Sequence, residues 1–191
     1  MQIEVFYSYA CRDTYKVFAW LECVQQQGIA LDILWHPFAV EIENEHEWSQ
    51  PWQTARSELR GFIAAEAARL QGESAFLRFH RLLERAVHEE YLELGDVQTI
   101  LHVAEEAALN MDSFRPALHD PEMAAIAQQS HRRGVEQFKV FGTPTLIFPS
   151  ENAIHLELDQ VPTADHAIPL FENIKAIGMD YPYVHQIKRT L

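Results

Sequence analysis

A cysteine stands where the pattern of a strand gives way to the pattern of a helix. Residues 2–8 carry β-branched and aromatic side chains in rough alternation, which predicts a strand. Cys11 follows, and apolar residues after it recur at helical spacing as far as Gln27. The first turn of a helix offers unpaired N–H groups and the positive end of the helix dipole, so a thiol there is stabilised as a thiolate. The spacing therefore predicts that Cys11 is a nucleophile.

The residues after Cys11 modify the chemistry expected of its thiol. Arg12 adds a positive charge nearby, and Asp13 partly opposes it. The Thr14 hydroxyl could donate a hydrogen bond to the sulfur. A simpler interpretation is that Thr14 satisfies a backbone N–H in the first turn. Another interpretation makes Cys11 an inert remnant in a structural domain, because a fold does not dictate a function.

The second cysteine, Cys23, is not placed to form a disulfide with Cys11. It lies 12 residues further along the same predicted helix. That separation is about 18 Å, at about 1.5 Å per residue. A disulfide requires Cα atoms closer than about 7 Å. We therefore expect Cys23 to be a small buried apolar residue.

Strand and helix patterns alternate at both ends of the chain. Residues 30–36 alternate in polarity and end at Pro37. They predict a second strand parallel to the first, because a whole helix connects the two. Near the other end, a short apolar run follows Gly142-Thr143-Pro144 directly. The elements predicted there are a strand at 145–148, a strand at 154–158 and a helix at 163–178. The pattern of residues 181–191 predicts neither a helix nor a strand clearly.

The middle of the chain, residues 54–134, shows no strand pattern. Asp120-Pro121-Glu122 is a strong helix start, with an N-cap aspartate, a proline and an acid near the positive end of the dipole. We predict about four helices from the apolar spacing. A turn is predicted near Gly134, where the helix could also continue toward Val140. The fold class is therefore α/β, in the order β-α-β, helical block, β-β-α.

This order, with Cys11 after the first strand and Pro144 before the third, resembles the thioredoxin-like superfamily and, within it, the DsbA-like family. The nearest branch includes FrnE-type proteins, 2-hydroxychromene-2-carboxylate isomerases and kappa-class glutathione transferases. The resemblance implies a thioredoxin-like fold with a large all-helical insertion that lies over the Cys11 end and shapes a substrate cleft. The implied division is a thioredoxin-like domain at 1–45 and 135–191 and a helical subdomain at 46–134. The residues that carry the resemblance are Phe6-Tyr7-Ser8-Tyr9-Ala10-Cys11-Arg12-Asp13-Thr14-Tyr15, Trp35-His36-Pro37-Phe38 and Val140-Phe141-Gly142-Thr143-Pro144-Thr145.

The resemblance also implies roles for individual residues. The bond before Pro144 would be cis, and the backbone of Thr143 would pair with an extended peptide or with glutathione. Arg12, Thr143 and Pro144 are then substrate-binding residues, and Cys11 and Thr14 are catalytic. Pro144 is a rigid strand entry whether or not it also binds substrate. The family's C-x-x-C motif reads Cys11-x-x-Thr14 here, so the resolving thiol is missing. Cys11 could still attack a disulfide and be released by an external thiol such as glutathione.

Three functions follow as hypotheses. The first is a thiol-disulfide oxidoreductase of the DsbA/FrnE type that works through Cys11 alone. The second is a glutathione-dependent transferase or isomerase, with glutathione held by Thr143 and the start of the first helix. The third is a non-enzymatic domain that binds an extended peptide. The expected partner is therefore a thiol or disulfide peptide or glutathione as a co-substrate, and no other cofactor is expected.

Composition excludes other classes of function. The chain has 191 residues and a formal charge of −13, which argues against nucleic acid and against anionic membranes. No run approaches the roughly 18 apolar residues that span a bilayer. The first residues lack the basic and apolar regions of a signal peptide. We therefore expect a cytoplasmic protein whose thiols stay reduced.

Metal binding has only weak support in the sequence. His80, Glu84 and His88 share one helix face, but His80 also lies on an apolar stripe, and one helix rarely completes a metal site. We predict no metal. The acidic stretch is interpreted as a solvated linker rather than a cation site; it contains Glu41, Glu43, Glu45 and Glu47.

A homodimer is the remaining hypothesis about partners. Trp48 and Trp52 follow the acidic stretch, with apolar residues around them. Large aromatic side chains are enriched where protein surfaces associate. The apolar residues around Trp48 and Trp52 could serve a dimer interface, and the oligomeric state stays open.

Overall fold

The sheet has four strands and is mixed in direction. In the computed structural model, which describes residues 1–42, 44–184 and 187, the strand order is β2-β1-β3-β4. Strand β1 is parallel to β2, β3 is antiparallel to β1, and β4 is antiparallel to β3. The strands are β1 (Gln2–Tyr7), β2 (Asp32–Pro37), β3 (Thr145–Ile147) and β4 (Ala153–His155). The predicted order and the parallel first pair are confirmed, although β4 is shorter than expected.

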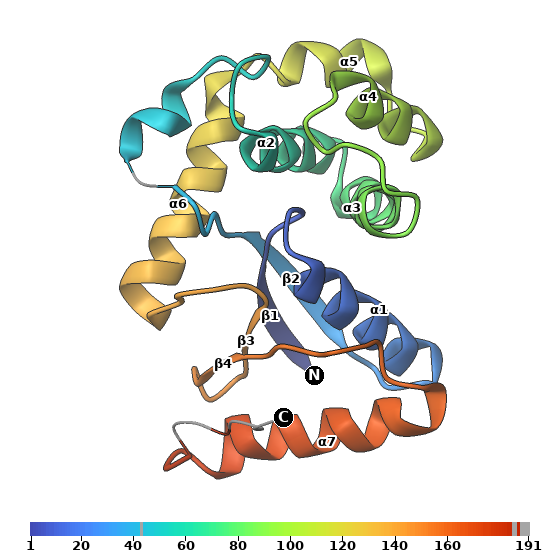
Figure 1. Ribbon diagram of the computed structural model, residues 1–191, viewed down its shortest axis with the longest axis vertical. Coiled ribbons are helices and arrows are strands. Elements are labelled where there is room, and N and C mark those ends of the chain that lie inside the picture. Colours follow the sequence, from blue (N-terminus) through green and yellow to red (C-terminus); the bar gives the residue numbers. More distant parts are fainter. Residues whose placement is uncertain (43, 185–186, 188–191) are drawn as a thin grey trace.

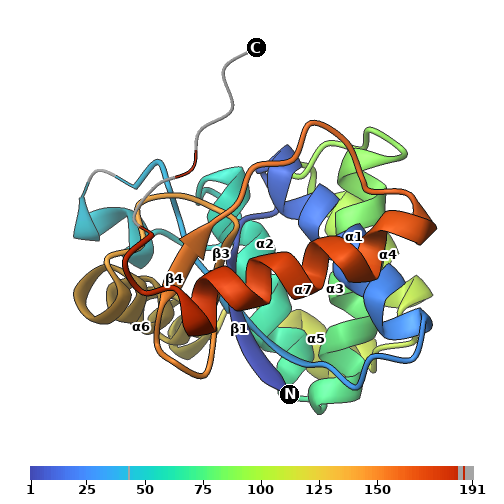
Figure 2. The same cartoon turned by 90° about the horizontal axis from the view of Figure 1, so that it is seen from below.

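Two helices directly follow strands of the sheet and pack against each other. Helix α1 (Arg12–Gln26) connects β1 to β2, and α7 (Ala164–Asp180) follows β4. They lie side by side in both views (Figures 1 and 2). The indole nitrogen of Trp20 on α1 donates a hydrogen bond to the Ala167 carbonyl on α7 over 2.9 Å. This contact anchors α1 on α7 and so helps to position Cys11 at the start of α1.

The segment between β2 and β3 is helical. Figure 1 shows α2 to α5 together above the sheet, where the loop between β1 and α1 reaches up to α2 and α3. Its elements are the short 3₁₀ helix η1 (Glu45–Ser49), α2 (Ser57–Arg69), α3 (Glu73–His88), α4 (Val97–Glu106), α5 (Met111–Ala117) and α6 (Pro121–Phe138). This part of the chain thus has one α-helix more than predicted. Asn110 caps the seven-residue α5, which contains Pro116 and is too short for a clear periodicity.

Helix α6 runs through Gly134, where the sequence predicted a turn. A Cβ atom at Gly134 would lie 2.9 Å from a Phe38 ring carbon and 3.0 Å from a Phe6 ring carbon. The glycine therefore allows close packing of the helix against β1 and β2 rather than ending it. Helix α6 begins among the insertion helices and ends beside the sheet (Figure 1). It crosses the predicted boundary between residues 134 and 135, and the division into two subdomains stays a proposal.

The core is shared by the sheet and the insertion. Trp48 and Trp52 are only 6% and 5% exposed and belong to this core. The chain itself buries both rings, so the rings are not exposed to form a dimer interface, and a homodimer stays a proposal. Large fully buried side chains come from both parts of the chain: Tyr7, Trp20, Phe62, Phe79, Phe114 and Phe171.

Some predictions lie outside the residues that the structure describes. Glu43 of the acidic stretch and most of the unassigned tail beyond Val184 are among them. No helix in the described part of the chain is long and apolar enough to cross a membrane.

Candidate functional site

Cys11 is the N-cap residue of α1, as the sequence predicted. Its backbone is extended, with φ −96° and ψ 114°. Its N–H donates to the Ser8 carbonyl over 3.0 Å, and its own carbonyl accepts from the Tyr15 N–H over 3.4 Å. The side chain is half-buried. The thiol therefore stands at the positive end of the helix dipole and can still be reached from solvent.

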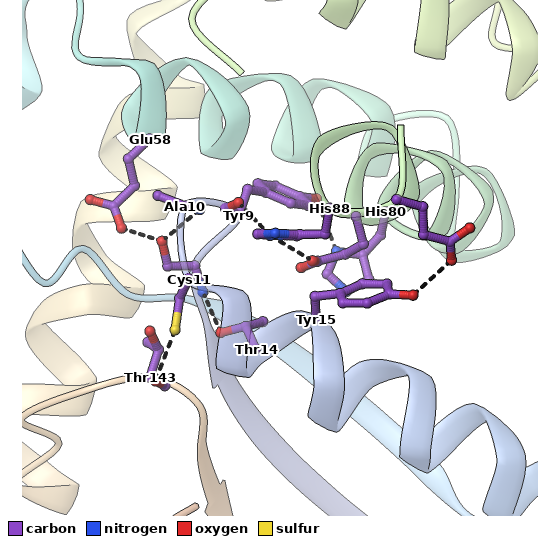
Figure 3. A network of polar contacts seen from close by, with 12 residues as sticks. Tyr9, Ala10, Cys11, Thr14, Tyr15, Glu58, His80, His88 and Thr143 are labelled. Carbon is purple, nitrogen blue, oxygen red and sulfur yellow. Dashed lines mark hydrogen bonds and ion pairs between the residues drawn. The ribbon is translucent and has the colours of Figure 1, made fainter. Parts of the chain in front are cut away.

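The structure brings Cys11 and Thr143 together across 132 residues of sequence (Figure 3). The thiol donates to the Thr143 carbonyl oxygen over 3.2 Å. The Thr143–Pro144 peptide bond is cis, and both residues are buried. The Thr143 hydroxyl oxygen is buried without a hydrogen-bond partner among the described residues. The carbonyl group that precedes the cis bond thus lies beside the sulfur.

Thr14 is fully buried and turned toward the loop before Cys11. Its hydroxyl oxygen accepts a hydrogen bond from the Ser8 N–H over 3.3 Å. Thr14 therefore satisfies a backbone N–H, but that of Ser8 in the preceding loop rather than one in the first turn of the helix. No hydrogen bond between Thr14 and the Cys11 sulfur occurs within the described part of the chain. Thr14 thus shapes the loop that carries the thiol.

The charged neighbours of Cys11 point outward. Arg12 is exposed on the first turn of α1. Asp13 forms an ion pair of 2.8 Å with Lys16, which offsets the negative charge of Asp13. Cys23 is half-buried near the other end of α1, and its sulfur accepts from the Gln27 side chain over 3.2 Å. Both cysteines are free thiols, and Cys23 is more exposed than predicted.

Two polar residues at the site had no assigned role in the sequence analysis. Ser8 is 1% exposed, and its hydroxyl donates to Glu58 Oε1 and accepts from the Ala10 N–H, the latter over 3.2 Å. Glu58 comes from the first turn of α2. Burial raises the pKa of the Glu58 carboxyl group, although hydrogen bonds from Ser8 and the Val40 backbone oppose this. Ser8 is among the residues that carry the family resemblance. No local sequence pattern singles out Glu58, which is 50 residues away from Ser8.

Two of the three residues on one face of α3, His80 and His88, contact the same loop through Tyr9. His80 Nδ1 lies 2.9 Å from the Tyr9 hydroxyl, and His88 Nε2 lies 3.0 Å from the Tyr9 carbonyl oxygen. Burial lowers the pKa of His80 to about 3. Glu84 is completely buried, and burial raises its carboxyl pKa, with the nearby Cys11 adding to the effect. No group of three metal-ligating side chains occurs in the described residues.

The model of a family described as "Thioredoxin" matches residues 14–163. The chain is 26% identical over 130 residues to "ClpXP adapter protein SpxH" of Bacillus subtilis (strain 168), covering 68% of this chain. The match covers 39% of SpxH, so this chain corresponds to less than half of that relative.

Two solved structures are similar in fold. One is "Cytosolic disulfide reductase DsbM from Pseudomonas aeruginosa with GSH", with TM-score 0.60, 17% identity, and coverage of 91% of this chain and 98% of that chain. The other is a 2-hydroxychromene-2-carboxylate isomerase, with TM-score 0.64, 13% identity, and coverage of 93% and 96%. At such low identity, the two structures show a likeness of fold alone. This likeness confirms the predicted thioredoxin-like α/β architecture with its helical insertion. With the family model matching most of its length, the chain belongs to the thioredoxin family.

Proposed function

We propose that the protein is a thiol-disulfide oxidoreductase of the DsbA-like type, with Cys11 as its single reacting thiol. The observation that carries this proposal is the position of Cys11. It is the N-cap residue of α1, and its sulfur lies 3.2 Å from the carbonyl oxygen of Thr143, next to the cis bond to Pro144. The fold of a disulfide reductase, DsbM, supports it. We propose that the protein works in the cytoplasm, where thiols stay reduced.

The reaction would proceed by two thiol-disulfide exchanges. The Cys11 thiolate attacks one sulfur of a substrate disulfide, forming a mixed disulfide, and the other substrate sulfur leaves as a thiolate that takes up a proton. No second cysteine lies near Cys11, since Cys23 is at the far end of α1. An external thiol such as glutathione therefore attacks the mixed disulfide. It departs joined to the first substrate sulfur, and Cys11 is restored.

Thr143 would couple substrate binding to this reaction. In the free protein the thiol hydrogen is directed at the Thr143 carbonyl oxygen. A substrate backbone N–H that binds this oxygen would compete with the thiol for it. Pro144 would hold this strand in position, and exposed Arg12 would contact the rest of the substrate.

The test is adduct formation with glutathione disulfide, read by intact-protein mass. Cys11→Ser and Cys23→Ser are matched variants, since each leaves one half-buried free thiol on the same helix. We expect one glutathione adduct on the parent and on Cys23→Ser, and none on Cys11→Ser. An adduct confined to Cys23, or none on any variant, would exclude the proposed reaction.

A second candidate is a peptide-binding domain without catalysis. It is favoured by the match to SpxH, described as an adapter protein, over 68% of this chain. Binding would then use the Thr143 backbone and would not need the thiol. In a pull-down with a bait peptide lacking cysteine, this candidate predicts capture that survives Cys11→Ser and is lost in Thr143→Trp. Equal capture by all variants would count against it.

A further inference from the structure

A cavity separate from the Cys11 site lies between α1, β2 and α3. Its volume is about 130 Å³. An apolar cavity of about 150 Å³ holds one benzene molecule, so this cavity has room for roughly one six-membered ring. Leu77 and Arg81 on α3 line the cavity and are exposed, so it opens to solvent beside them. Among the described residues that line it, none belongs to the loop that carries Cys11.

His80 lines this cavity and is only 1% exposed. Its Nδ1 lies 2.9 Å from the Tyr9 hydroxyl oxygen (Figure 3), whereas its Nε2 is buried without a hydrogen-bond partner among the described residues. The two nitrogens of an imidazole ring point in diverging directions, so Nε2 points away from Tyr9. The rings of Phe18 and Trp35 pack against the His80 ring, at centroid distances of 5.5 and 4.7 Å, and both also line the cavity. These contacts direct the unpaired nitrogen toward the cavity.

The other polar side chains that line the cavity have partners within the protein. Glu22 and Arg81 form an ion pair. The Gln25 amide donates to a backbone carbonyl over 2.7 Å, and the Asp32 carboxylate accepts from a side-chain amide over 2.7 Å. Buried polar atoms nearly always have a hydrogen-bond partner. The partner of His80 Nε2 must therefore come from a molecule inside the cavity.

The surroundings of His80 Nε2 favour an uncharged ring compound over water or an ion. A buried water makes about three hydrogen bonds, but the nearest walls are the apolar rings of Phe18 and Trp35. Burial lowers the pKa of His80 to about 3, so its ring is neutral. An ion would therefore lose its hydration without gaining an opposite charge. In a neutral imidazole, Nε2 either donates or accepts according to the tautomer, and a hydroxyl group can bond to it in both cases.

We propose that this cavity binds a phenol-like molecule, whose hydroxyl group forms a hydrogen bond with His80 Nε2 and whose ring packs against Phe18 and Trp35. Aromatic rings in offset or edge-to-face contact attract one another beyond the area that they bury. An occupant would also cover Leu77, which is 42% exposed at the mouth. The inference is independent of the proposed thiol chemistry, because Cys11 takes no part in the binding.

Phenol itself is the probe, and its binding to the whole chain is followed by nitrogen NMR of the histidine side chains. We expect saturable binding that moves the Nε2 signal of His80. Benzene has the same ring without the hydroxyl group and should bind about tenfold more weakly, because one hydrogen bond is lost. Benzoate, which carries a charge, should not move the signal.

Leu77→Trp tests the location of the site, because a larger side chain at this exposed position would fill the mouth of the cavity and leave His80 in place. Leu70→Trp is the matched control, at a leucine that is 63% exposed at the end of α2. We expect phenol binding to be lost in Leu77→Trp and unchanged in Leu70→Trp, with the amide spectrum of each variant verifying that it is folded. A His80 Nε2 signal that phenol does not move, equal affinity for phenol and benzene, or equal binding by Leu77→Trp and the parent would each overturn the proposed site.

Discussion

At the scale of single residues, the thiol of Cys11 is defined by the groups that fix its loop. The buried Ser8 N–H donates a hydrogen bond to the Thr14 hydroxyl, and the Cys11 N–H donates one to the Ser8 carbonyl. The sulfur itself donates a hydrogen bond to the Thr143 carbonyl oxygen. Reactivity is therefore expected to depend on what displaces that hydrogen bond and on where the proton goes.

Thr14→Val tests the structural role of the Thr14 hydroxyl. The change leaves the buried Ser8 N–H without its acceptor, which costs about 1–3 kcal/mol. The loss should appear as a lower free energy of unfolding in urea. Thr54→Val, on an exposed threonine, is the control and should have little effect. Equal stability of Thr14→Val and the parent would contradict this role.

Glu84→Gln tests whether the carboxyl group that is buried beside His88 is protonated in the folded protein. Burial raises the pKa of Glu84 well above 4.5, so the folded protein keeps a proton that the unfolded chain loses as the pH rises. The parent should therefore lose stability relative to the variant above pH 4.5 by up to about 1.4 kcal/mol per pH unit. Urea unfolding at several pH values measures this. A difference independent of pH would contradict the assignment.

At the scale of elements, helix α6 joins the insertion to the sheet. It contacts α2 and η1 along part of its length and β2 along another part. Near the sheet, Gly134 lies so close to Phe38 and Phe6 that no side chain fits between them. The insertion is thus held over the Cys11 loop by a continuous helix.

Gly134→Ala tests this close approach. Alanine favours a helix over glycine by about 1 kcal/mol, but its Cβ would lie 2.9 Å from the Phe38 ring. Overpacking of this kind costs about 1–3 kcal/mol, so we expect a net loss in the free energy of unfolding. Gln129→Ala, at an exposed position of the same helix, should be close to neutral. A gain of stability at Gly134 would show that the rings can move aside.

At the scale of the whole molecule, one core ties both parts of the chain together around His80. Its ring lies 4.7 Å from the rings of Tyr7 and of Trp35 and 5.3 Å from that of Phe76, measured between ring centroids. These aromatic groups come from β1, β2 and α3. A charged imidazole in this position would be costly, so the folded state favours the neutral ring.

The protonation of His80 should reflect this burial. Its pKa is lowered from 6.5 to about 3, so the folded protein keeps it neutral where the unfolded chain is protonated. The contribution of His80 to stability is therefore fully present above pH 6.5 and is lost as the pH falls toward 3. Nitrogen NMR of the folded protein should show an unchanged neutral ring from about pH 8 to about pH 5. A titration centred near 6.5 would contradict the packing.

The sequence by itself determined the order of the elements, the parallel first strands and the place of Cys11 at the start of α1. These features follow from local periodicity and capping, which short stretches of chain encode. Only the tertiary structure decided that Gly134 lies within a helix, that Trp48 and Trp52 are buried, and that Thr143 and Glu58 flank the Cys11 loop. The contacts of the site join residues 50 and 132 positions apart. Such contacts arise from how the helical insertion and β3 close around one core, and no local pattern of residues carries that information.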